Sequence, residues 1–453
     1  MKRESLAVSS YFHVLLYSCV LLIFPIAAEA GVFTLLGSAD TVPSSEGWAL
    51  DVAVSGNYAY VAQNAAGLQV FDISDLCNPV AVGAVTGTQA ITNVAVDGNH
   101  VYALWSGSEE KGLYTIDATD PANPSLLATR TSPTRCNGMA VANGRAYLAE
   151  SEGLQILDIS DPASPSLLGT YATSNMAWRV AVEGDLAYLM VHGYDTECGR
   201  QLQILNVSNP AAPVMVGSCC LPDTYDADYG DYLSVYCYEI NVKAGYAYLA
   251  WADGMTGGYF AGRLDTIDVS DPAHPVRCGI FMTSPGVRGM ALDGDNVYLC
   301  VKQENLQALN GTAPCEPSYL GFTEAWGAMN ACARDGYVFL ANGSFEDLMV
   351  FEVDSDRDGL SDHEETSALT NPYARDTDGD RLSDFVEVNN YGTDPLKADT
   401  DDDGANDADE VAFGTDPCSA TETLELPLSA WCVMAAAISL AAIAAFRLRR
   451  AHA

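Results

Sequence analysis

The phrase LQILDISDPASPSLLG (Leu154–Gly169) decides the fold, because the chain repeats it. Close variants begin at Leu68, Leu113, Leu202, Leu264 and Leu306, and a shortened seventh copy, LMVFEV, begins at Leu348. Successive copies start 41 to 62 residues apart, which is near the length of a four-stranded propeller blade. Because proline cannot donate a hydrogen bond to a β-ladder, the Asp-Pro pair ends one strand, and SLLG begins the next.

A hairpin pattern precedes every copy of the phrase. In VAVSGNYAYVA (52–62) and VAVEGDLAYLM (180–190), alternating apolar residues flank a glycine-containing turn, as two antiparallel strands require. The second strand always carries an aromatic residue at one position: Tyr60, Tyr102, Tyr147, Tyr188, Tyr248, Tyr298 and Phe339. We interpret these aromatics as packing between blades. Four strands in each of seven units predict an all-β, seven-bladed propeller over residues 31–353.

The seventh unit lacks its fourth strand, because the pattern stops at Val353. The missing strand is present at the other end of the domain, since VFTLLGSAD (32–40) matches the strand-four pattern. We therefore predict that the N-terminal strand completes the last blade and closes the ring, which removes an exposed edge. The competing interpretation is an open β-solenoid with an unpaired edge strand.

The units resemble the LVIVD-repeat family, on the strength of phrases such as LQVFDIS, LQILDIS and LDTIDVS. The resemblance covers about residues 32–353 and weakens in the sixth unit, where NGTAPCEP replaces the usual turn. It implies β-propellers on exported proteins and no particular enzymatic activity.

Three acidic twelve-residue segments follow the propeller: DSDRDGLSDHEE (354–365), DTDGDRLSDFVE (376–387) and DTDDDGANDADE (399–410). Each has acids at positions 1, 3, 5, 9 and 12, which suits the oxygen ligands of Ca²⁺, and position 7 can offer its backbone carbonyl. The predicted metal ligands are Asp354, Asp356, Asp358, Leu360, Asp362 and Glu365; Asp376, Asp378, Asp380, Leu382, Asp384 and Glu387; and Asp399, Asp401, Asp403, Ala405, Asp407 and Glu410. Position 6 is Gly359 and Gly404 in the outer segments but Arg381 in the middle one.

Residues 354–417 resemble bacterial-type thrombospondin type 3 repeats, with TNP or GTDP turns between the segments. We expect Ca²⁺ to bind with a dissociation constant on the order of 10⁻⁴–10⁻³ M, as in extracellular modules. The ions would stiffen a stalk and leave the melting of the propeller nearly unchanged. The alternative is a solvated acidic linker, since most charge runs have that role.

Both ends of the chain predict export and anchoring. Residues 1–30 have a basic start, an apolar run and a small-residue cleavage site, as in a signal peptide. After a linker (418–427), the uncharged residues 428–446 are long enough for one transmembrane helix, and 447–453 form a basic cytoplasmic tail. This end resembles the C-terminal sorting signals of bacterial surface proteins. The predicted location is the cell surface or envelope, with the propeller and stalk outside.

Charge and cysteine content exclude some classes of protein. The formal net charge of −39 excludes a nucleic-acid partner, which would need a basic surface. The 13 cysteines show no zinc-binding spacing, and an oxidising compartment favours disulfides. Cys198, Cys219, Cys220 and Cys237 cluster around one insertion, but their pairing stays open.

No motif for nucleophilic, phosphate-binding or dinucleotide chemistry occurs, and the few histidines form no spaced pair. We therefore expect a non-enzymatic surface or adhesion protein whose propeller binds a protein or glycan. One alternative is an exported propeller hydrolase or lyase with carboxylates on one face; it predicts acids together with basic or aromatic residues around the channel mouth. Another is a structural envelope component.

Overall fold

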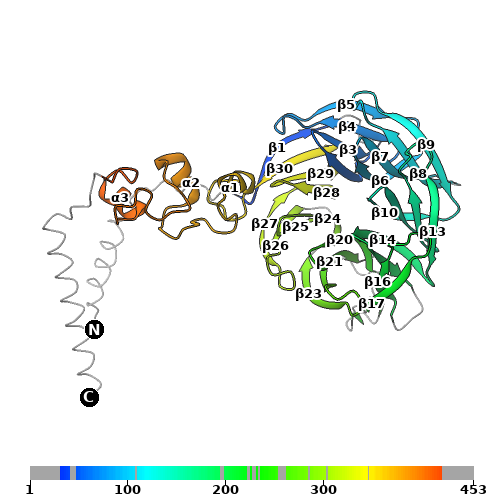
Figure 1. Ribbon diagram of the computed structural model, residues 1–453. Coiled ribbons are helices and arrows are strands. Elements are labelled where there is room, and N and C mark those ends of the chain that lie inside the picture. Colours follow the sequence, from blue (N-terminus) through cyan, green and yellow to red (C-terminus); the bar gives the residue numbers. More distant parts are fainter. Residues whose placement is uncertain are drawn as a thin grey trace, which may run out of the picture.

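Alternation of apolar and polar residues gives seven antiparallel sheets arranged around a central channel (Figure 1). The computed structural model describes residues 31–40, 47–107, 110–193, 198–221, 225–226, 231–232, 235–253, 262–283, 286–301, 305–344 and 346–420. The acidic segment, residues 354–420, extends from the side of the ring (Figure 1). The predicted seven-bladed propeller is confirmed.

Six blades use four consecutive strands, with the first strand at the channel and the fourth at the rim (Figure 1). Blades 1 to 3 comprise β2 (Asp51–Ser55), β3 (Tyr58–Ala62), β4 (Leu68–Asp72) and β5 (Val80–Val85); β6 (Ala90–Asp97), β7 (His100–Ser106), β8 (Lys111–Asp117) and β9 (Ser125–Ser132); and β10 (Cys136–Ala142), β11 (Arg145–Glu150), β12 (Gly153–Asp158) and β13 (Ser166–Ala172). Blades 4 to 6 comprise β14 (Met176–Glu183), β15 (Leu186–His192), β16 (Arg200–Asn206) and β17 (Val214–Cys220); β20 (Val235–Lys243), β21 (Tyr246–Asp253), β22 (Gly262–Asp268) and β23 (Val276–Thr283); and β24 (Val287–Asp293), β25 (Asn296–Val301), β26 (Asn305–Asn310) and β27 (Ser318–Glu324). A two-stranded sheet of β18 (Tyr225–Asp226) and β19 (Asp231–Tyr232) lies in the connection between blades 4 and 5.

Blade 7 is built from both ends of the propeller sequence. Its strands run in the order β28 (Ala328–Arg334), β29 (Tyr337–Asn342), β30 (Leu348–Val353) and β1 (Phe33–Ala39). Strands β1 and β30 pair antiparallel, from Phe33 opposite Val353 to Ala39 opposite Leu348. The N-terminal strand therefore closes the ring, and the open solenoid is excluded.

The recurring aromatic residue of each second strand is buried between blades. Tyr60 of blade 1 is 3% exposed and packs in one apolar cluster with Val94 and Val101 of blade 2. Phe339 of blade 7 joins Val52 of blade 1 in the same way across the closing joint. The interpretation of these residues as inter-blade packing is confirmed.

The repeated phrase also forms a contact between neighbouring blades. Asp158 ends β12 and accepts a hydrogen bond from the Ser160 amide at 2.9 Å, which turns the chain toward the rim strand. The glycine that ends SLLG lies against the turn of the next blade: a Cβ on Gly169 would lie 2.2 Å from the Pro210 carbonyl oxygen. Gly37 of β1 lies against the first turn in the same way, because a Cβ there would lie 2.6 Å from the Leu76 carbonyl oxygen.

Two disulfides lie in the second half of the ring. Cys198 pairs with Cys220, within the predicted cysteine cluster. Cys278 of β23 pairs with Cys315, so a covalent bond joins blade 5 to the atypical turn of blade 6. The other seven cysteines of residues 31–420 are free thiols, Cys219 and Cys237 among them.

A short helix begins at position 9 of each acidic segment. The helices are α1 (Asp362–Ala368), α2 (Asp384–Val386) with the π-helix η1 (Glu387–Tyr391), and α3 (Asp407–Phe413). Ser361, Ser383 and Asn406 cap their N-termini through side-chain oxygens. Within the described residues, none of the helices has the length and apolar character needed to cross a membrane. The predicted signal peptide, transmembrane segment and tail lie outside the described residues.

Candidate functional site

The three acidic loops each bring aspartates from alternate positions together. Positions 1, 3 and 5 contribute carboxylate oxygens that lie within 4.8 Å of one another. The groups are Asp354, Asp356 and Asp358 in the first loop (354–365); Asp376, Asp378 and Asp380 in the second (376–387); and Asp399, Asp401 and Asp403 in the third (399–410). The sequence spacing therefore produces three compact anionic sites.

Two positions in every loop carry buried carboxylate oxygens with no hydrogen-bond partner among the described residues. At position 3 they are the Oδ2 atoms of Asp356, Asp378 and Asp401. At position 12 they belong to Glu365, Glu387 and Glu410, whose residues are 0% exposed. A buried carboxylate without a partner costs roughly several kcal/mol of folding free energy. A bound cation would remove this cost and stabilise the loop. The donor set, all oxygen, suits a hard cation such as Ca²⁺.

The electrostatics of the loops agree with this fit. Burial, reinforced by the Asp356 carboxylate, raises the pKa of Glu365 to about 9. Burial beside Asp378 raises the pKa of Glu387 to about 8. These carboxyl groups resist ionisation because their surroundings are desolvated and already negative. A divalent cation would reverse that balance.

Position 9 has a structural role that spacing alone does not reveal. Asp362, Asp384 and Asp407 each accept two hydrogen bonds from position 2, one from its amide and one from its hydroxyl. The hydroxyl contacts are all 2.7 Å and come from Ser355, Thr377 and Thr400. These aspartates therefore brace their loops. At position 7, Leu360, Leu382 and Ala405 donate their amides to the position-5 carboxylates at 2.7–2.9 Å.

Position 6 has the same backbone conformation in all three loops, with φ of 109° at Gly359, 93° at Arg381 and 100° at Gly404. A side chain is disfavoured there, so Arg381 carries a conformational cost. Its guanidinium donates to Asp409 of α3 at 2.6 Å, which links the second loop to the third repeat. The middle loop thus keeps the geometry that the glycine pattern left open.

Neighbouring repeats are also joined through the position-5 aspartates. Asp358 accepts from the Phe385 amide at the start of α2 at 2.7 Å, and Asp380 accepts from the Ala408 amide of α3 at 2.9 Å. A carboxylate at a helix N-terminus is favourable because the first amides there lack partners. The first and second loops therefore also order the repeat that follows each of them.

The first loop is docked on the propeller. Asn296 at the start of β25 donates to Asp362 at 2.9 Å and to the Ser355 hydroxyl at 3.1 Å, and it accepts from the Tyr373 hydroxyl at 3.2 Å. Arg357 donates to the carbonyl oxygen of Leu320 and lies against Gly321 of blade 6. In five other blades the equivalent glycine meets a turn of the repeated phrase, and blade 2 has Ala128 there, so the first loop fills the place of the missing seventh turn.

A second polar cluster lies in the channel, and the sequence analysis did not identify it. One residue of the first strand of each blade lies at an equivalent register position: Asp51, Asn93, Gly138, Arg179, Glu239, Gly289 and Asn330. All of them except Gly289 line the cavity in the channel. We call this set the channel ring. In six blades a β-bulge directly precedes the ring residue. Its sequence signal is the position immediately before each hairpin pattern.

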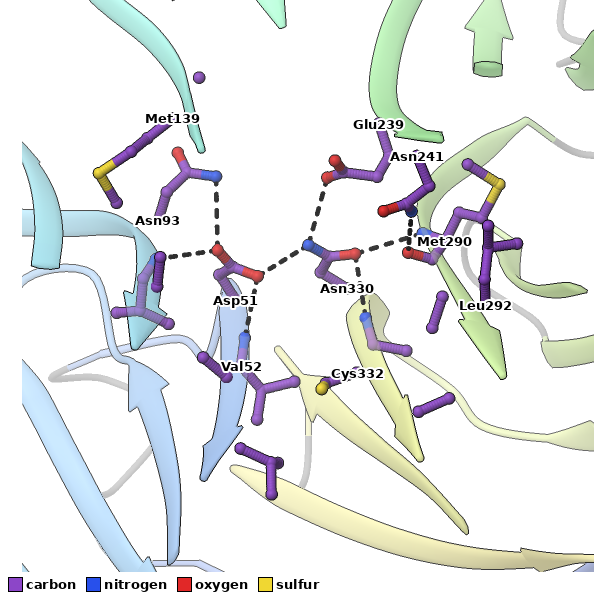
Figure 2. A pocket seen from close by; sticks show the side chains of 18 of the residues that line it. Asp51, Val52, Asn93, Met139, Glu239, Asn241, Met290, Leu292, Asn330 and Cys332 are labelled. Atoms are coloured by element: carbon purple, nitrogen blue, oxygen red, sulfur yellow. Dashed lines mark hydrogen bonds between the residues drawn. The ribbon is translucent and has the colours of Figure 1, made fainter. Parts of the chain in front are cut away.

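Hydrogen bonds connect four members of the channel ring, Asp51, Asn93, Glu239 and Asn330, beside a cavity of about 350 Å³ (Figure 2). The Asn330 amide donates to Asp51 Oδ1 at 2.7 Å and to Glu239 Oε2 at 3.4 Å, so it bridges the two carboxylates. Asp51 also accepts from the Val94 amide at 2.9 Å. Burial raises the pKa of Asp51 to about 6, and burial raises the pKa of Glu239 to about 7 although Arg179 opposes the shift.

Comparisons with known proteins agree with both parts of the structure. A model of the LVIVD repeat matches residues 46–87, 136–173, 174–220 and 236–283, which cover blades 1, 3, 4 and 5. The chain contains LVIVD repeats. A model of the bacterial TSP3 repeat matches residues 354–373, 376–398 and 399–420. TSP3 repeats bind calcium, and the three aspartate groups could hold the metal. The repeat types suggest an extracellular protein.

Solved structures share the propeller fold. The WD40 β-propeller domain of Doa1 aligns over 72% of this chain and 99% of its own, with 9% identity and a TM-score of 0.50. The β-propeller domain of Myceliophteria thermophila Cps50 (Swd1) aligns over 71% and 99%, with 10% identity and a TM-score of 0.50. At these identities the likeness concerns the fold alone. No curated protein sequence matches the chain.

Proposed function

We propose that this chain is an exported, membrane-anchored binding protein without catalytic activity. Three Ca²⁺ ions order the acidic segment into a stalk, and the propeller presents the channel mouth to a protein or glycan ligand. Residues 1–30 direct export and residues 428–446 anchor the protein. The agreement between extracellular repeat types, acidic loops and a closed ring supports this proposal.

One observation carries the calcium role: the same two positions of all three loops have buried carboxylate oxygens without partners. Isothermal titration of the full chain with CaCl₂ tests it. We expect binding of three ions with dissociation constants on the order of 10⁻⁴–10⁻³ M. The triple variant Glu365→Gln, Glu387→Gln, Glu410→Gln keeps the shape of the side chains but replaces one carboxyl oxygen of each by an amide nitrogen, which is a poor ligand for Ca²⁺. We expect this variant to lose most of the heat of calcium binding.

Asp402→Asn is the matched control, because Asp402 lies in the third loop but its side chain is 81% exposed. We expect this control to bind calcium like the wild type. Retention of normal calcium binding by the triple variant would reject the ligand assignment. An absence of binding to the wild type at millimolar calcium would instead favour the acidic-linker alternative.

A second candidate is the hydrolase or lyase alternative, which predicts acids with basic or aromatic residues around the channel mouth. Asp51, Glu239, Arg179 and Trp178 meet that description. The raised pKa of Glu239, about 7, would suit proton transfer near neutral pH. Turnover of a ligand by the wild type, and its loss in Glu239→Gln, would establish this alternative over the binding role.

A further inference from the structure

The channel opens into a broad depression on one face of the propeller. A cavity of about 440 Å³ at the channel mouth and a wider one of about 830 Å³ share Leu50, Arg288 and Met329 as lining residues. The wider part lies over the chain segments that lead into β2 and β28. Each of the two cavities is within the usual size range of ligand sites, about 300–1,000 Å³.

Positive charge gathers at this mouth in a chain whose net charge is −39. Arg135, Arg179 and Arg288 line it, and the guanidinium groups of Arg135 and Arg179 both lie 5.8 Å from the Trp178 ring. Arg179 is held by its Nε, which donates to the Tyr238 carbonyl at 2.6 Å. The pKa of Glu239, raised by burial to about 7, reduces the opposing negative charge at neutral pH. Arginine forks are suited to carboxylates.

Two tryptophans make the wider part of the depression aromatic. Trp48 is 56% exposed and Trp326 is 55% exposed, and both line the larger cavity beside Arg288. An indole offers a large rigid surface at low entropic cost, so exposed tryptophans in a concave site are typical of ligand contacts. The apolar C–H face of a pyranose ring stacks on such a surface.

Amide and hydroxyl groups complete the site: Asn64, Thr92, Ser106, Asn137 and Ser344. Asn137 is 7% exposed, and its side-chain oxygen has no hydrogen-bond partner among the described residues. A buried acceptor without a donor is costly, and a ligand hydroxyl would satisfy it. This group is independent of the arginines and the tryptophans, and it also points to a ligand rich in hydroxyls.

We propose that this depression binds an acidic saccharide, with the ring faces on Trp48 and Trp326 and a carboxylate on Arg288 and Arg135. The inference rests on the proposed binding function and specifies its ligand class. A neutral glycan would offer no anionic group to the arginines at the channel mouth. An extended nucleic acid would be repelled by the rest of the surface.

The experiment uses the full chain and trigalacturonate as the probe, with its methyl ester as the uncharged counterpart. Calorimetry should detect binding of the acid and a loss of at least about tenfold in affinity for the ester. Arg288→Gln and Trp326→Ala should each weaken binding by about tenfold or more, as expected for residues at the centre of a site. Phe322→Ala and Arg375→Gln are matched controls, because both residues are exposed and lie outside the depression, and they should bind normally.

Melting curves of all four variants are the check that each of them folds. The proposal is overturned if trigalacturonate fails to bind or binds equally to Arg288→Gln and Trp326→Ala. Binding of the ester or of a peptide that depends on Trp326 would reject the acidic ligand while preserving the binding function. Cleavage of trigalacturonate would reject the non-enzymatic function and preserve the ligand class.

Discussion

The Asp354 amide donates to the carbonyl oxygen of Val32 at 3.0 Å, so a main-chain hydrogen bond joins the first acidic loop to the N-terminal strand. Val353, one residue earlier, ends the strand with which β1 pairs. The first loop contacts blade 6 through Asn296 and Leu320 as well. Ring closure and the first predicted calcium site therefore share one structural element.

From this joint we expect calcium to stabilise the propeller, in contrast to the independence expected from sequence. A calcium concentration about twenty times the dissociation constant should add about 2 kcal/mol. Tryptophan fluorescence during thermal unfolding reports it, because residues 354–420 contain no tryptophan. Glu365→Gln should abolish the shift, whereas Glu410→Gln in the third loop should retain most of it. Equal effects of the two variants would show that the first loop has no special coupling to the ring.

Replacing Arg381 by glycine should improve the second loop. Glycine adopts the left-handed backbone conformation without strain, which should stabilise the loop by about 1 kcal/mol. The change also removes the exposed ion pair with Asp409, which contributes at most about 1 kcal/mol. We expect a modest rise in calcium affinity at that site in Arg381→Gly. Asp409→Asn, which removes only the ion pair, separates the two effects in the same titration. A weaker site in Arg381→Gly than in Asp409→Asn would contradict the strain argument.

The stability of the propeller should fall as pH rises toward neutrality. Glu239 has a pKa raised to about 7 in the folded chain, above its usual value, so the folded state holds its proton more tightly than the unfolded state. The resulting stabilisation is complete below the unfolded pKa and is lost as pH rises through about 7. The melting temperature of the Glu239→Gln variant should depend less on pH across this range than that of the wild type. In the exposed control Glu152→Gln, the wild-type slope should persist.

A methyl group at Gly169 should separate two blades. The added Cβ would lie 2.2 Å from the Pro210 oxygen, and such overpacking costs about 1–3 kcal/mol. Urea unfolding of Gly169→Ala measures the cost. The reciprocal control is Ala128→Gly in blade 2, at the equivalent register position, which should cost less than about 1 kcal/mol. If Gly169→Ala unfolds at the same urea concentration as the wild type, the two blades can move apart at this contact without a cost in folding free energy.

The fold could be predicted because its signals are repeated: alternation, turn residues and one aromatic recur in every unit. The register of β1 followed from VFTLLGSAD alone, since Gly37 makes the same contact with a turn that Gly169 makes. The metal-site spacing was equally regular, and positions 1, 3 and 5 do converge. What spacing could not separate was Glu365, whose oxygens lack partners, from Asp362, whose oxygens brace the loop.

The channel ring could not be predicted because its members share a position but no chemistry. Asp51, Asn93 and Arg179 align only when the hairpins of their blades are superimposed. The hydrogen bonds between residues of different blades form only because the blades close into a ring. Contacts such as Asn296 with Asp362 join residues 66 positions apart in different repeat types. Pairings of this kind have no periodic signal.

The position of β1 sets an order of assembly. Its seven residues are synthesised before all other strands of the propeller, yet β30, the strand they pair with, follows more than three hundred residues later. Until then the growing ring has two unpaired edges, and such edges invite association with other chains. The first acidic loop emerges directly after β30, so the Ca²⁺ proposed for this loop would have to be present in the compartment where the last strand is added. Surroundings poor in divalent cations would therefore lengthen the period during which the nascent ring can aggregate.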